Sequence, residues 1–148
     1  MTWISGIGLN WIDPRDYKSN QIAGEIINKV SNIEEMHYTF RTPILIFNFL
    51  MLLLIYALLK RLWNKEIAII SFMLMALSPI LLGITRIVNP DALIWPFTTI
   101  SLLSYFLYLK EEKNKYLYMA GIFLGFSILT KYIANIVYIY FLIIVFLE

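Results

Sequence analysis

Five apolar runs without a charged side chain fill most of the chain after residue 42, and they constrain its fold more than any other feature. A helix rising about 1.5 Å per residue needs roughly 17 to 25 residues to cross the hydrocarbon core of a bilayer. Three runs reach that length, and tyrosines near the ends of the two shorter ones can lie in the interface and extend them. The runs are Pro43 to Leu59, Ile67 to Thr85, Ala92 to Leu109, Tyr116 to Thr130 and Ile133 to Leu147. A membrane protein with about five spans is predicted.

The composition agrees with this class, because 60% of the residues are hydrophobic, only 15% are charged and the mean hydropathy is +0.73. A soluble domain is nearer half apolar and a quarter charged. Every backbone polar group inside a bilayer needs an internal partner, and the runs show no alternation of period two. They are therefore predicted to be helices rather than barrel strands. The expected fold is all-α, a multi-pass transmembrane helical bundle.

Basic residues between the runs predict the orientation of the bundle. Two alternate turns hold Lys60, Arg61, Lys65, Lys110, Lys113 and Lys115. The positive-inside rule places these two turns in the cytoplasm. The other two turns hold only Arg86 and Lys131, so they are predicted to lie at the extracytoplasmic face of the cell membrane, together with residues 1–42.

Residues 1–42 are more polar than the rest and hold half of the ten acidic residues. They are predicted to form an outer-face segment, and residues 43–148 the transmembrane bundle. Within the first segment, apolar residues recur at helical spacing and polar residues take the other positions. The apolar positions are Ile22, Ala23, Ile26, Ile27 and Val30. This pattern predicts a short amphipathic helix that lies on the membrane surface.

Several classes of site are excluded by what the chain lacks. It has no cysteine and one histidine, which excludes disulfides, thiol nucleophiles and multi-histidine metal sites. Six of the twelve basic residues already serve as orientation signals, and no basic stripe for nucleic acid is visible. The expected partners therefore include membrane lipids and no nucleic acid.

Three motifs stand in a fixed order along the bundle: Leu77-Ser78-Pro79, then Arg86 followed by Asn89 to Leu93, then Ala120 to Tyr132. In this order they resemble the GT-C superfamily of membrane glycosyltransferases, specifically the protein-mannosyltransferase and lipid A aminoarabinose-transferase type. Those proteins show Leu-Ser-Pro, Arg, Asp-Ala and Ala-Gly-Ile-x-Leu-Gly-x-x-x-Leu-Thr-Lys. The resemblance covers roughly residues 13 to 146. Because family members run to several hundred residues, the chain is expected to be part of a longer protein and inactive alone.

The resemblance implies a reaction. A sugar passes from a polyprenyl-phosphate carrier to the hydroxyl of a protein, lipid or glycan acceptor at the outer membrane face. A carboxylate must take the acceptor proton and cations must hold the leaving phosphate. Asp16 and Asp13 are the candidate bases. Asp16 aligns with the second acid of a Pro-Asp-Glu motif in which Arg15 replaces the first. Arg86 and Lys131 are the candidates for the donor phosphate.

Two further residues are candidates for orienting the acceptor or the site. His37 lies where the family often shows a histidine. Asp91 follows Asn89 and Pro90, and these three residues are typical of a helix start. In a functional interpretation Asp91 also orients Arg86, or helps to bind the acceptor or a divalent metal. Whether a metal takes part stays open.

Structural interpretations compete with these roles. Asp13 and Asp16 can open a turn and cap a helix, and basic residues at span ends such as Arg86 and Lys131 commonly snorkel. Gly121 and Gly125 predict a helix-packing notch.

A non-enzymatic membrane assembly protein or a transporter fragment is the alternative function. A transporter would carry charges near mid-bilayer, whereas every charge after Arg41 lies at a predicted span end.

Overall fold

The computed structural model describes Ile4, Ile7 and residues 33–86, 91–131, 134–136, 139–140 and 143–144. Its helices are α2 (Ile33–Leu62), α3 (Lys65–Ala76), α4 (Pro79–Arg86), α5 (Asp91–Glu111) and α6 (Asn114–Thr130). No strand occurs in these parts of the chain, so the prediction of an all-α fold is confirmed for them. The predicted surface helix around residues 22–30 lies outside the described residues.

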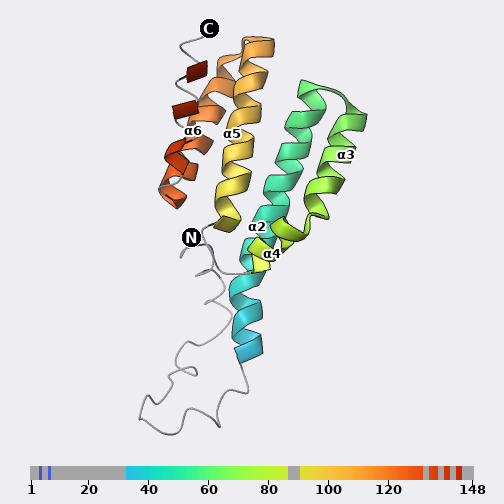
Figure 1. Ribbon diagram of the computed structural model, residues 1–148, viewed down its shortest axis with the longest axis vertical. Helices are drawn as coiled ribbons and strands as arrows, with labels where there is room; N and C mark the ends of the chain where they lie inside the picture. The colour runs from blue at the N-terminus through green and yellow to red at the C-terminus, as the bar shows by residue number, and fades with distance from the viewer. Residues whose placement is uncertain are drawn as a thin grey trace, which may run out of the picture.

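Helix α5 occupies the middle of the bundle (Figure 1). It packs against α2 on one side and α6 on the other, while α3 packs against α2. The α2–α3 and α5–α6 turns lie together at one end of the bundle. Helix α4, the start of α5 and the end of α6 lie toward the opposite end. The two lysine-rich turns therefore lie at one end of the bundle, and the segments that carry Arg86 and Lys131 lie toward the other.

The core lies where α2, α5 and α6 meet. On α2 the buried residues recur every three or four positions, at Ile44, Asn48, Leu52, Ile55, Leu59 and Leu62, as expected for a helix that buries one stripe. The last three of these pack with Ile100 and Leu107 of α5 and with Tyr116 of α6. Large apolar side chains also remain exposed on other helix faces, among them Ile70, Leu74 and Leu129. Extended apolar exposure of this kind is typical of a surface that contacts lipid or another protein.

The ends of α2 and α5 are joined by charged side chains at the turn end of the bundle. The Arg61 guanidinium contacts both carboxylate oxygens of Glu111, at 2.6 and 3.1 Å. Lys113 donates to the same carboxylate at 2.7 Å, and Lys110 donates to the Leu62 carbonyl oxygen. We call the Arg61, Glu111 and Lys113 cluster the turn-end clasp. Two basic residues that served as orientation signals therefore also bind a carboxylate.

Two helical segments in the described part of the chain are long and apolar enough to cross a membrane, Tyr38–Leu62 and Asp91–Glu111. Two is fewer than the five spans expected, and the five-span bundle is not confirmed. Helix α6 coincides closely with the predicted run from Tyr116 to Thr130. The run from Ile67 to Thr85, which we expected to be one span, is divided between α3 and α4.

Pro79 explains this division. It has no backbone N–H, and its ring would clash with the Met75 carbonyl group in a continuous helix. Helix α3 ends at its C-cap Leu77. Ser78 then precedes α4, and its hydroxyl oxygen accepts a 3.5 Å hydrogen bond from the N–H of Leu81. A serine cap followed by proline at the first helical position is a favourable helix start, so the apolar run ends one helix and begins another.

Candidate functional site

Asp91 and Lys131 form an ion pair at the end of the bundle opposite the turn-end clasp. The Lys131 Nζ atom lies 2.6 Å from Asp91 Oδ1, although the residues are 40 positions apart. The side chains are 44% and 32% exposed, respectively. Both groups are therefore accessible to a ligand that approaches this end.

Helix boundaries place these two side chains. Asp91 is the first residue of α5, where a carboxylate interacts favourably with the N-terminal helix dipole. Helix α6 runs back along α5 and ends at Thr130. Lys131 follows in extended conformation, and its backbone N–H donates to the Ser127 carbonyl oxygen at 3.3 Å. Because α6 reverses the direction of α5, its end returns to the level where α5 begins.

Hydroxyl groups join α6 to α5 in the region between the ion pair and the turn-end clasp. The hydroxyl oxygens of Thr98 and Ser127 lie 2.7 Å apart, and the Ser101 hydroxyl donates to the Ala120 carbonyl oxygen at 2.8 Å. In the part of the chain that the structure describes, the predicted packing notch takes no part in this contact. A methyl group built on Gly121 or Gly125 would meet no described atom within 4 Å. The rotation of α6 is therefore set by its Ser127 and Ala120 face.

The structure brings together only some of the candidate residues. Asp91 was expected to orient Arg86 or to help bind a metal or the acceptor. Its carboxylate contacts Lys131, and its role toward Arg86 stays a prediction. Arg86 is the last residue of α4, and His37 lies in the second turn of α2; the side chains of both are outside the described parts. Asp13 and Asp16 also lie outside them. Their predicted roles stay predictions.

The Asp91–Lys131 pair has a definite chemical capacity. A lysine ammonium group carries three donors, of which Asp91 accepts one. The others can bind the oxygens of a second anion while Asp91 holds the ammonium group in place. Among the described residues, no cluster of three or more histidine, aspartate or glutamate side chains could hold a metal ion.

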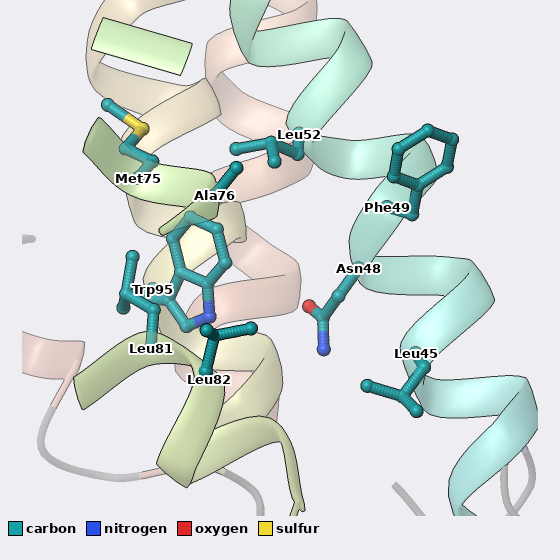
Figure 2. Close-up of a pocket in the computed structure, with 9 residues that line it drawn as sticks. All are labelled: Leu45, Asn48, Phe49, Leu52, Met75, Ala76, Leu81, Leu82 and Trp95. Carbon is teal, nitrogen blue, oxygen red and sulfur yellow. The ribbon is translucent and has the colours of Figure 1, made fainter. Parts of the chain in front are cut away.

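A pocket of about 220 Å³ lies between α2, α3, α4 and α5, and sequence analysis did not anticipate it (Figure 2). Asn48 and Trp95 supply its polar atoms. Asn48 is only 5% exposed. Neither its Nδ2 nor its Oδ1 atom, nor Nε1 of Trp95, has a hydrogen-bond partner among the described residues. An amide inside a predicted apolar span was a usable signal, because burying a polar side chain without a partner is costly.

Residues 26–148 match the family of dolichyl-phosphate-mannose-protein mannosyltransferases. The chain belongs to this family. No curated protein and no solved structure matches the chain. The resemblance inferred from the three motifs is thereby confirmed, and a protein-mannosyltransferase family chain of this kind is a membrane glycosyltransferase of the GT-C type.

The matched range has a consequence for the candidate residues of this mannosyltransferase-family chain. It contains His37, Arg86, Asp91 and Lys131. It begins after the two candidate bases, at residues 13 and 16. The family match thus includes the candidates for binding the donor phosphate and not the two candidate bases, and the roles of all of them stay predictions.

Proposed function

We propose that this mannosyltransferase-family chain takes part in transferring a sugar from a polyprenyl-phosphate donor to an acceptor hydroxyl at the extracytoplasmic face. The acceptor belongs to a protein, a lipid or a glycan. Family membership supports the class of reaction. The observation that carries the location is the Asp91–Lys131 pair, an exposed ammonium group held at the same end of the bundle as the end of α4.

The transfer has three chemical requirements. The acceptor oxygen forms a bond to the anomeric carbon while the bond from that carbon to the phosphate oxygen breaks. The acceptor proton moves to a carboxylate, for which Asp16 or Asp13 is proposed. The departing polyprenyl phosphate carries away the bonding electrons, and fixed cations stabilise that negative charge.

Lys131 and Arg86 are proposed to bind the phosphate together. Arg86 ends α4, which lies at this end of the bundle, and Lys131 follows α6, which runs toward it. Two cations near one another repel, whereas a phosphate between them satisfies both. Asp91 keeps the Lys131 ammonium group in position, and His37 is proposed to orient the acceptor from α2.

Substitution of Lys131 tests this proposal in the complete protein reconstituted in lipid. Because a hydrogen bond to a charged group contributes about 1.5–3 kcal/mol, we expect Lys131→Ala to weaken donor binding or turnover about tenfold or more. Arg86→Ala should have a similar effect. Asp91→Asn should have a smaller one, because the ammonium group remains. Initial rates at several donor concentrations measure these changes.

Lys115→Ala serves as the matched control, since it removes a lysine from the turn end of the bundle. We expect it to keep normal donor affinity. If Lys131→Ala and Arg86→Ala both behave like this control, the two cations snorkel and the phosphate binds elsewhere.

A further inference from the structure

The pocket between α2, α3, α4 and α5 presents hydrogen-bonding groups that no described residue uses. Figure 2 shows the Asn48 carboxamide and the Trp95 indole nitrogen entering the pocket from opposite walls. A buried amide left without a partner costs about 1–3 kcal/mol. Asn48 nevertheless faces this space rather than solvent, with 5% of its surface exposed. These two groups are placed to bind a ligand.

The remaining lining restricts the chemistry of that ligand. It is apolar and without charge, and it includes Leu52, Met75 and Leu81. A phosphate would have to be buried here without a cation, which is strongly unfavourable. A neutral oxygen acceptor attached to a hydrocarbon chain fits both the N–H donors and the apolar wall.

The depth of the pocket points to one class of lipid. Trp95 lies four residues after Asp91 on α5, which places it about 6 Å further along the helix. The interfacial layer that separates hydrocarbon from the outer edge of a bilayer is about 5–8 Å thick on each side. The proposed orientation puts Asp91 at the outer edge of that layer, and Trp95 is then expected where the ester groups of glycerolipids join their acyl chains. Tryptophan is enriched at this depth.

The pocket is also open to the surface of the bundle. Its rim includes Phe49 and Leu82, which are 55% and 45% exposed. Ala76 at the end of α3 and Leu82 of α4 both line the pocket, on either side of the break between these two helices (Figure 2). A volume of about 220 Å³ accommodates part of a lipid and not a whole molecule.

We propose that this pocket binds the acyl-ester region of a membrane glycerolipid. The ester carbonyl oxygen accepts hydrogen bonds from Nδ2 of Asn48 and Nε1 of Trp95. The adjoining acyl chain lies along Leu52 and Met75. Water or a hydroxyl group of the lipid donates to Oδ1 of Asn48. This site is separate from the sugar-transfer reaction and from its phosphate-binding cations.

Photolabelling of the complete protein tests the proposal. The purified protein is illuminated in micelles with a phosphatidylcholine that carries a diazirine on its acyl chain, and labelled peptides are quantified by mass spectrometry. Label should map to the pocket walls. Loss of a hydrogen bond predicts that Asn48→Leu and Trp95→Phe each reduce this labelling about fivefold. Ser104→Ala is the matched control. Ser104 is also a buried polar residue whose side chain has no described partner, but it does not line the pocket.

Two further measurements separate the possible occupants. Unlabelled phosphatidylcholine should compete for the site and raise the Tm of the wild-type protein, whereas Asn48→Leu should show no such increase. Citronellyl phosphate, a short isoprenoid phosphate, should not compete. Competition by citronellyl phosphate alone would assign the pocket to the donor lipid and overturn the proposal. Equal pocket labelling in wild type, Asn48→Leu and Trp95→Phe, or no labelling in any, would overturn it as well.

Asn48→Leu also reports on folding. It replaces an unpaired buried amide by an apolar group of similar size, so its Tm without added lipid should equal or exceed that of the wild type. If this variant unfolds instead, Trp95→Phe decides the question, because it keeps an aromatic ring and removes only the indole N–H.

Discussion

Lys131 illustrates how one residue can satisfy both a structural and a functional interpretation. Its position after α6 suits snorkelling, yet its ammonium group is held by Asp91 at 2.6 Å. An exposed ion pair contributes little to the free energy of unfolding, so stability alone is a weak reason for pairing these two residues across the bundle. Binding of a phosphate is a stronger reason, because a cation held at an accessible helix end can stabilise the negative charge of such a ligand.

Asp16 is the residue whose substitution tests the proposed base. We expect Asp16→Asn to reduce turnover of the complete protein by about two to four decades, the usual effect of losing a general base. Donor binding should be largely kept, because the amide has nearly the same shape. Asp13→Asn should reduce turnover less. Single-turnover rates and donor affinity measure the two effects separately.

One result would contradict the proposal that Asp16 or Asp13 is the base. Near-normal turnover in both variants would assign Asp13 and Asp16 to turn formation and helix capping.

At the scale of helices, proline positions show why apolar runs and helices do not coincide. Pro43 and Pro96 lie inside α2 and α5, whereas Pro79 begins α4. Ser78 precedes Pro79 and can cap a new helix. Thr42 precedes Pro43 and instead donates to the Tyr38 carbonyl oxygen within α2, at 2.7 Å. The helix is therefore interrupted at Pro79, where the preceding serine caps a new helix, and continues through Pro43, where the preceding threonine bonds back to the same helix.

The turn-end clasp is predicted to hold α2 against α5. Glu111→Gln removes the charge that Arg61 and Lys113 share, so we expect a measurable decrease in Tm. Glu112→Gln, which removes the same charge one position later, should decrease the Tm by less than half as much. Thermal unfolding at low ionic strength measures both.

Salt provides the check on this explanation. The Debye length falls to about 3 Å at 1 M salt, so the difference between the two variants should shrink there. An equal decrease in both variants, or a difference independent of salt, would contradict the clasp.

At the scale of the whole molecule, the number of basic residues differs between the two ends of the bundle. The turn-end clasp and the lysine-rich turns lie at one end, and the Asp91–Lys131 pair lies toward the other. Together with the positive-inside rule, this separation supports the proposed orientation, in which the site faces out of the cytoplasm.

Single cysteines test that orientation, because the chain has no cysteine of its own. Cysteines at Asn64 and Asn114 should be protected from an impermeant thiol reagent added outside intact cells. Cysteines at Asn32 and Asn89 should be labelled. Permeabilised cells, in which all four should react, provide the control, and labelling of position 64 or 114 from outside would reverse the orientation.

Features that depend on neighbours in the chain could be predicted from the sequence by itself. Apolar runs without alternation determined that the described elements are helices. Asp91 lies in the first turn of α5 and Thr130 ends α6, as expected, because caps, dipoles and proline act within about one helical turn. The order of short motifs was sufficient to identify the family.

Only the tertiary structure decided which side chains meet. The Asp91–Lys131 contact spans 40 positions, and the pocket joins Asn48 to Trp95 on another helix. Such contacts depend on the rotation and relative height of packed helices, which follow from how side chains of several helices fit together. Residue spacing along one helix does not contain that information. The contact between Asp91 and Lys131 and the pocket could therefore be seen only in the packed structure.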